Sequence, residues 1–239
     1  MNSGDSVRAG PAIEVADVVK SYDHAVRALN GMDLTVNYGE FVALMGPSGC
    51  GKSTLLHLLA ALDEPTSGRI AVNGRDLHSA GNDRFRRMEI GLVFQLHNLL
   101  PNLNALENVQ IPMFGTGANR GDRLRRAREL LDEMGLREKE KMTPPRLSGG
   151  ERQRLAIARA LANSPSIILA DEPTGNLDSA AVDHLLALFR GILGEHRVTI
   201  LMATHDSHVA SASDRIVYMR DGRIVEAPRR ESEPVAPAG

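Results

Sequence analysis

Short apolar runs bounded by polar residues recur along this 239-residue chain. Three of them, at residues 41–45, 167–170 and 198–203, contain almost no polar side chain. A continuous apolar run of this length predicts a strand that is covered on both faces, as in a parallel sheet with helices on either side. We therefore expect an α/β fold built on a mainly parallel sheet with helices on both faces.

An alternating pattern of apolar and polar residues begins near the N-terminus of the chain. It predicts two short strands at residues 13–15 and 18–20, separated by an Ala-Asp pair. The turn pairs Asn73-Gly74 and Asp221-Gly222 each predict a β-hairpin. We expect the N-terminal strands and the hairpin at Asn73-Gly74 to form an antiparallel β flap beside the parallel sheet.

The middle of the chain has helical periodicity. Apolar residues recur at helical spacing between residues 124 and 134, and Gly135 is placed to end that helix. We expect an inserted helical subdomain at about residues 96–162 within a single domain at 12–227. Residues 1–11 and 228–239 are rich in Pro, Gly, Ser and charge, a composition typical of disordered termini.

A second helix is predicted to begin after Ser148, which forms the capping-box pattern S-x-x-E with Glu151. Gly149 and Gly150 would leave the first N–H groups of this helix exposed, and such groups can bind an anion. The S-x-x-E pattern alone is also compatible with a capped helix that binds no ligand.

The most specific motif is a glycine-rich loop that fits the pattern G-x-x-x-x-G-K-[ST]. Its glycines let successive backbone N–H groups surround a phosphate, and the helix that follows directs its positive end to the same place. Lys52 then reaches the outer phosphates, and Ser53 ligates magnesium. The motif predicts that the chain binds a nucleoside triphosphate through Gly46, Pro47, Ser48, Gly49, Cys50, Gly51, Lys52, Ser53 and Thr54.

Polar side chains follow two of the predicted parallel strands. Asp171 and Glu172 come after the run at 167–170, and His205 comes shortly after the run at 198–203. Ligands of α/β sheets bind at the carboxyl ends of the strands, so the two acids are candidates for chemistry. A single histidine after a strand is more often a packing residue, and so is Tyr22, a lone aromatic that ends a predicted strand.

Amino-acid composition narrows the classes of partner and of protein that remain. The 28 Lys and Arg against 30 Asp and Glu give a formal charge of −2, which offers no reason to expect nucleic acid as a partner. Cys50 is the only cysteine, so an internal disulfide is impossible. The first residues lack the apolar core of a secretory signal, and no run approaches the roughly 18 apolar residues of a membrane-spanning helix. A membrane role would therefore require a partner.

Together these motifs resemble the ATP-binding subunit of ATP-binding-cassette transporters, from about residue 13 to 226. Residues 46–54 match the Walker A loop, 147–153 the family signature and 167–172 Walker B. Further matches are the switch histidine at His205, the glutamine that opens the helical lobe at Gln95, the loop after Walker B at Asn176, Leu177 and Asp178, and the adenine-stacking aromatic at Tyr22.

The resemblance implies a head-to-tail dimer with a second copy or a close paralogue, in which ATP lies between residues 46–54 of one subunit and 148–150 of the other. It implies that Glu172 positions the attacking water and that His205 senses the γ-phosphate. The implied nucleotide contacts include Tyr22, Lys52, Gln95, Ser148, Gly149, Gly150 and Asp178, and the implied Mg²⁺ ligands are Ser53, Gln95 and Asp171.

Finer features at residues 93–95, 98–101, 105–109 and 172–178 resemble the subfamily of lipoprotein-releasing and macrolide-exporting ATPases. This resemblance implies an integral membrane permease as partner and a peripheral position on the cytoplasmic face of the cell membrane. A regulatory ATPase of the cell-division type is the alternative. A soluble DNA- or ribosome-associated ATPase is less favoured, because a long heptad insertion and a second cassette are missing. A P-loop kinase would leave the signature unexplained.

Two features leave open questions. The apolar loop at residues 96–103 can be part of the core or a docking surface, and we expect it to border the membrane partner. Cys50 lies beside a helix N-terminus and close to Lys52, so we expect a reactive thiol that alkylators reach unless nucleotide covers it.

Overall fold

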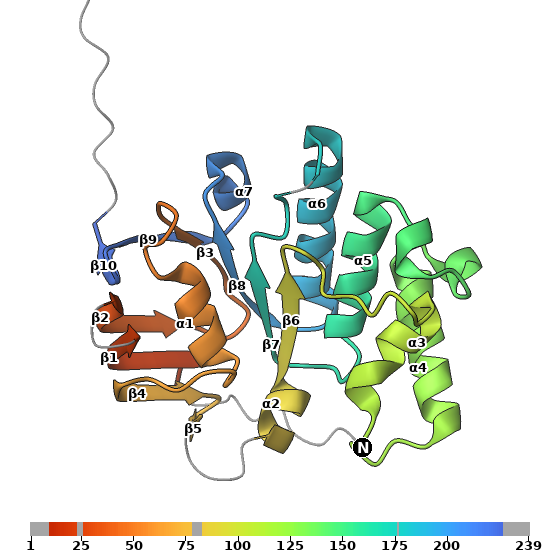
Figure 1. The fold of residues 1–239 in the computed structure, drawn as a ribbon, viewed down its shortest axis with the longest axis horizontal. Helices are drawn as coiled ribbons and strands as arrows, with labels where there is room; N and C mark the ends of the chain where they lie inside the picture. Colours follow the sequence, from red (N-terminus) through yellow and green to blue (C-terminus); the bar gives the residue numbers. More distant parts are fainter. Residues whose placement is uncertain (1–9, 23–25, 78–82, 176, 227–239) are drawn as a thin grey trace, which may run out of the picture.

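The structure is a computed structural model that describes residues 10–22, 26–77, 83–175 and 177–226 (Figure 1). Apart from Gly10 and Pro11, the predicted disordered termini lie outside these residues, as does Asn176.

A six-stranded sheet forms the centre of the molecule, in the order β10-β9-β3-β8-β7-β6. The pairs from β9 to β6 are parallel, and β10 joins β9 as an antiparallel hairpin, as its Asp-Gly turn predicts. The mainly parallel sheet is thereby confirmed. Its strands are β3 (Phe41–Met45), β6 (Ile90–Phe94), β7 (Ile167–Asp171), β8 (Thr199–Thr204), β9 (Arg215–Arg220) and β10 (Arg223–Val225).

The continuous apolar runs arise because both faces of the central strands are buried. In β7, Ile168 and Ala170 contribute to the hydrophobic cluster that includes the helical lobe. Ile167 and Leu169 point to the opposite face and join a second cluster. Successive strand residues face opposite sides of a sheet, so a strand between two cores is apolar at nearly every position.

A second, four-stranded antiparallel sheet has the order β2-β1-β4-β5 and is the predicted flap. Its strands are β1 (Ile13–Tyr22), β2 (Val26–Val36), β4 (Ser67–Val72) and β5 (Arg75–Asp76). The β4–β5 hairpin turns at Asn73-Gly74, as predicted.

The prediction of two separate strands at 13–15 and 18–20 was wrong, because β1 runs through both. The pairing register shifts between Val15 and Val18, and Asp17 adopts a left-handed conformation with φ 47°. Its N–H donates to the Asp33 carboxylate at 2.9 Å. A β-bulge therefore accommodates the polar pair without ending the strand.

Helices cover both faces of the six-stranded sheet. Helix α1 contacts β2, β4 and β7 and so lies between the two sheets, whereas α5 and α6 lie on the far side (Figure 1). The helices are α1 (Lys52–Leu59), α2 (Asp83–Glu89), α3 (Ala105–Gln110), α4 (Arg120–Glu133), α5 (Gly149–Ala160), α6 (Ser179–Glu195) and α7 (Ser207–Ser211), with 3-10 turns η1 (Ile111–Met113), η2 (Arg137–Lys139) and η3 (Pro144–Arg146).

Helices α3, α4 and α5 come between β6 and β7 in the chain and form the helical lobe. Gly135, with φ 65°, follows the end of α4, and Ser148 and Glu151 form both hydrogen bonds of the predicted capping box of α5. Buried residues of this lobe share one hydrophobic cluster with the sheet. This shared core supports our proposal that residues 12–227 form one domain with an inserted subdomain at about 96–162. None of the described helices combines the length and the apolar character of a membrane-spanning segment.

Candidate active site

The carboxyl ends of four parallel strands meet at one edge of the sheet. Phe94 at the end of β6 pairs with Asp171 at the end of β7, and Asp171 pairs with Ala203 in β8. Met45 at the end of β3 pairs with Thr204. This register brings the segments that begin at residues 46, 95, 172 and 205 to the same edge, where ligands of α/β sheets bind.

The glycine loop between β3 and α1 has positions that no other residue could fill without movement. A Cβ at Gly46 would lie 2.2 Å from the Met219 carbonyl oxygen. Gly51 has φ +106°, and a Cβ there would lie 2.4 Å from the Ala28 carbonyl oxygen. The loop is therefore pressed against β9 and β2, and its shape depends on glycine.

Lys52 is buried although it carries a charge, with 6% of its surface exposed. Its Nζ donates to the carbonyl oxygens of Gly46 at 2.7 Å and Pro47 at 3.2 Å, and lies 4.0 Å from Glu172 Oε1. The ammonium group is thus held inside the loop by the loop's own carbonyls. A buried cation with such weak pairing suits an anionic ligand in the loop.

Cys50 differs from expectation. Its side chain is 4% exposed and belongs to the hydrophobic cluster beneath the loop. It packs so closely that a Cβ at Gly46 would lie 2.7 Å from its Sγ. The prediction of an accessible thiol was wrong, because the loop folds Cys50 inward, and we now expect slow alkylation even without nucleotide.

Glu172 and His205 are brought into contact. Glu172 Oε2 lies 2.8 Å from His205 Nδ1, and the Glu172 N–H donates to the Ala203 carbonyl oxygen at 3.0 Å. Glu172 itself has φ 44°, an uncommon left-handed conformation for a side chain of this size. Such conformations persist where the surrounding structure holds them, and they concentrate at functional sites.

Asp171 has a carboxylate oxygen in an environment that suits a cation. Its Oδ1 is buried and accepts no hydrogen bond from the described residues. Gln95 reaches the loop after β7, since a Cβ at Gly175 would lie 3.0 Å from Gln95 Nε2. Carboxylate, hydroxyl and amide oxygens are hard ligands of the kind Mg²⁺ prefers, so Asp171, Gln95 and Ser53 fit that ion.

Tyr22 ends β1 as predicted and is 39% exposed. Its hydroxyl donates to Asp63 Oδ2 at 2.7 Å, and Lys20 Nζ donates to Asp63 Oδ1 at 2.5 Å. Partial burial and the Asp63 carboxylate raise the pKa of the Tyr22 phenol. Asp63 therefore holds the Tyr22 ring in place, and no sequence pattern links these two distant residues.

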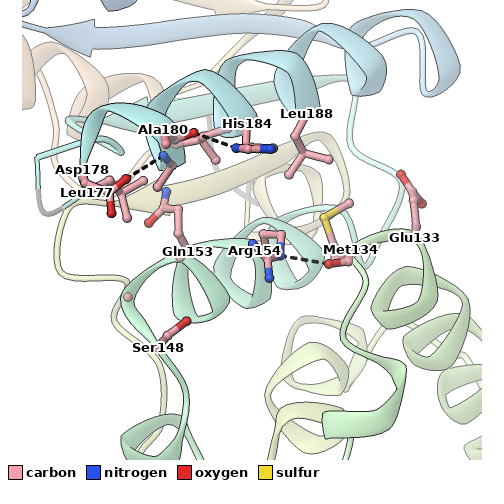
Figure 2. Close-up of a pocket in the computed structure, with 14 residues that line it drawn as sticks. Glu133, Met134, Ser148, Gln153, Arg154, Leu177, Asp178, Ala180, His184 and Leu188 are labelled. Carbon is pink, nitrogen blue, oxygen red and sulfur yellow. Dashed lines mark hydrogen bonds between the residues drawn. The ribbon is translucent and has the colours of Figure 1, made fainter.

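The signature residues lie apart from this cluster. Ser148, Gly149, Gly150 and Asp178 line a crevice of about 800 Å³ between α5 and α6 (Figure 2). None of the described residues that line it belongs to the loop at 46–54 or to the cluster around Glu172. One chain thus carries two separate candidate nucleotide surfaces.

The signature cap is reinforced from outside its helix. Lys139 donates to the Glu151 carboxylate, which also accepts the Ser148 N–H at 2.9 Å. These two hydrogen bonds hold the pKa of Glu151 below its usual value. Lys139 is not among the site residues predicted from the sequence, because no sequence pattern links it to a cap 12 residues away.

The apolar loop at 96–103 is neither wholly core nor wholly surface. His97 is buried, and Leu99 packs against the main cluster, which is the hydrophobic cluster that the sheet shares with the helical lobe. In contrast, Leu96 is 76% and Leu100 43% exposed. Asn108, which is fully buried, accepts the Leu100 N–H at 2.9 Å and donates to the Leu100 and Leu103 carbonyl oxygens.

Comparison with known proteins agrees with these features. The model of the ABC transporter family matches residues 29–175. The chain is 48% identical over 232 residues to the lipoprotein-releasing system ATP-binding protein LolD of Anaeromyxobacter dehalogenans, covering 94% of this chain and 97% of that protein. It is 45% identical to the macrolide export ATP-binding/permease protein MacB of Hyphomonas neptunium, over 90% of this chain but 34% of that protein.

A solved structure of a related protein has a similar fold. The dimeric post-hydrolysis state of the ATP-binding cassette MJ0796, bound to ADP and Pi, superposes with a TM-score of 0.81 at 40% identity, covering 89% of this chain and 96% of that one. The predicted fold class and the resemblance to lipoprotein-releasing and macrolide-exporting proteins are confirmed, and these relatives favour the transporter function over the cell-division alternative. The chain belongs to the ABC transporter family, in which it is an ATP-binding subunit that hydrolyses ATP.

Proposed function

We propose that this subunit powers an integral membrane permease through ATP-driven, head-to-tail dimerisation at the cytoplasmic face of the membrane. One observation carries the proposal. The loop at 46–54, Glu172 and His205 lie at one edge of the sheet, whereas residues 148–150 line a separate crevice. Two half-sites that do not meet within one chain are complete only when a second chain supplies the missing half.

Hydrolysis transfers the γ-phosphoryl group of ATP to water, so the site must position the water and stabilise charge. We assign Lys52 and the glycine-loop N–H groups to the phosphates. Glu172 accepts a proton from the attacking water as the P–O bond to ADP breaks. His205, 2.8 Å from Glu172, orients that carboxylate and contacts the γ-phosphate.

Mg²⁺ is the second proposed component. When bound, it would neutralise part of the negative charge of the phosphates during transfer. Ser53, Gln95 and Asp171 are its proposed ligands, and the unpartnered buried Oδ1 of Asp171 supports this assignment. Tyr22 is assigned to stacking on adenine, and Asp178, which caps α6 through the Ala181 N–H, to the dimer contact near the nucleotide.

The permease contact is assigned to the apolar loop at 96–103. Leu96 and Leu100 are exposed large apolar side chains on a loop that begins beside Gln95. A loop that joins a proposed Mg²⁺ ligand to the surface can report the nucleotide state to a partner. The name of LolD, a protein of a lipoprotein-releasing system, supports a partner of this kind.

The first test uses Glu172→Gln, which keeps the shape of the side chain but cannot accept the proton. We expect ATP turnover to fall by roughly 10²–10⁴. We also expect the variant to elute as a dimer on size exclusion with ATP and Mg²⁺ and as a monomer without ATP.

Two control variants separate ATP binding from dimerisation. Adding Lys52→Ala to Glu172→Gln removes the loop cation, so ATP should no longer produce the dimer. Adding Ser148→Arg instead blocks the second half-site but leaves the loop intact, so ATP should bind without dimerisation. A Glu172→Gln protein that stays monomeric with ATP, or hydrolyses it at the parental rate, would contradict the proposal.

A further inference from the structure

Three potential metal ligands meet at the ends of two helices, away from the proposed active site. Glu133 is the last residue of α4, Glu195 the last of α6, and His196 the C-cap of α6. We call these three residues the Glu133 cluster. Each offers one ligand atom, and the three atoms all lie within 4.8 Å of one another. His196 Nε2 is already 2.8 Å from Glu133 Oε1.

The electrostatic setting favours a cation at this point. Two carboxylates contribute negative charge, and the carbonyl ends of α4 and α6 converge on the same place. The C-terminal end of a helix carries a partial negative charge that stabilises cations nearby. The His196 side chain is 17% and the Glu133 side chain 27% exposed, whereas Glu195 is exposed to solvent, so two of the three ligands are partly screened from water.

The backbone holds the ligands in place. The His196 N–H donates to the Ile192 carbonyl oxygen at 2.9 Å, which continues the helical hydrogen bonding through the cap. The Met134 carbonyl oxygen, at the C-cap of α4, accepts Arg154 Nε at 3.1 Å. Both helix ends are therefore ordered, and a metal would not have to organise them.

We propose that the Glu133 cluster binds a divalent transition cation of the Zn²⁺ class. One imidazole nitrogen and two carboxylate oxygens suit Zn²⁺, with water completing the coordination. Mg²⁺, which prefers oxygen ligands in octahedral geometry, fits this donor set less well. Metal binding uses the neutral His196 tautomer with its proton on Nδ1, in which the Nε2 lone pair binds the metal in place of the present contact with Glu133. A proton held on Nε2 passes to solvent while Nδ1 takes one up, and a ring protonated at both nitrogens releases its Nε2 proton to solvent.

Such a site would connect the helical lobe with the nucleotide core, since Glu133 belongs to α4 and the other two ligands to α6. Figure 2 shows Glu133 at the opposite end of the crevice from Ser148. A metal at this end would tie α4 to α6, and α5, which carries the signature residues, is held to the end of α4 by the Arg154 hydrogen bond. It would thereby restrict how far the signature residues move from Asp178. This consequence rests on the proposed function, whereas metal binding itself does not.

The test is a titration of the untagged, nucleotide-free chain with Co²⁺ in excess Mg²⁺, followed by visible absorption. Excess Mg²⁺ occupies oxygen-only sites and leaves the mixed site open. We expect an absorption band that Zn²⁺ abolishes by displacement. Glu195→Gln keeps the His196–Glu133 contact but removes one ligand, and we expect it to weaken Zn²⁺ binding by about tenfold or more, since even outer-shell changes cost 10–100-fold.

His208→Gln is the matched control. His208 Nε2 also contacts a carboxylate, Asp183 Oδ1, at 2.7 Å, but it belongs to no group of three ligands among the described residues. We expect the control to bind Co²⁺ like the parent. Parental binding by Glu195→Gln and His196→Gln, or loss of binding in His208→Gln, would overturn the proposal, as would a parent without any band. The melting temperature of each metal-free variant shows whether it is folded.

Discussion

At the scale of single residues, burial changes how several side chains behave. His97 is 8% exposed and has φ 60°, and its imidazole lies near Arg152 and Arg159. Burial, with added repulsion from Arg152, lowers the pKa of His97. The folded chain therefore keeps this imidazole neutral, although it lies in a loop that connects the sheet with the helical lobe.

This lowered pKa predicts a pH dependence of stability. The unfolded chain takes up a proton on His97 near its ordinary pKa of about 6.5. The folded chain takes it up only at lower pH, so stability is full above pH 6.5 and falls as pH drops towards the folded pKa. Asparagine tolerates the left-handed backbone at this position. Between about pH 7.5 and 5.5, the melting temperature of His97→Asn should therefore fall less than that of the parent.

Equal losses in the parent and His97→Asn would contradict the assignment to His97.

At the scale of elements, one asparagine fixes the loop between β6 and α3. Asn108 is fully buried, and its amide reaches the carbonyl oxygens of Leu100, Leu103 and Asn104 in addition to the Leu100 N–H. Arg159 of α5 donates to the carbonyl oxygens of His97 and Asn98 from the other side. These hydrogen bonds therefore hold the loop in one conformation, although it has no regular secondary structure.

Asn108→Ala should lower the free energy of unfolding by about 1–3 kcal/mol, because it leaves buried backbone groups of the loop without partners. Chemical denaturation measures this change, and hydrogen exchange should rise at Leu100 and Leu103. Asn102→Ala removes the same amide from an exposed position of the loop, and we expect little effect. An Asn108→Ala protein as stable as Asn102→Ala would show that the loop does not depend on this anchor.

At the scale of the whole molecule, the loop links the active-site edge to the surface. Its apolar residues are divided by the fold, with Leu99 packed against the main cluster and Leu96 and Leu100 exposed. Exposed large apolar side chains beside the proposed Mg²⁺ ligand Gln95 are the surface that we assign to the permease.

Leu96→Asp and Leu100→Asp should therefore leave the melting temperature and the ATP-driven dimer of the isolated chain unchanged but abolish copurification with the permease. Leu99→Asp should instead destabilise the isolated chain, because it places a charge against the core. Copurification that survives both surface changes would contradict the assignment of the loop as the permease contact.

The sequence by itself determined the fold class, the glycine loop, the strand-end acids and the signature cap. Each depends on a local pattern, such as a buried strand, a glycine conformation or a capping box, whose physical requirements lie within a few residues. It also determined the family, since the glycine loop, the signature and the strand-end acids occur together in one order.

Only the tertiary structure decided which distant groups meet. The contact of Glu172 with His205, the burial of Cys50, the anchor at Asn108 and the Glu133 cluster join residues whose sequence separation says nothing about their distance. The β-bulge at Asp17 belongs here too, because the Asp33 carboxylate that satisfies its N–H comes from the neighbouring strand. Such contacts follow from how the two sheets and the helical lobe pack, and no local pattern encodes that packing.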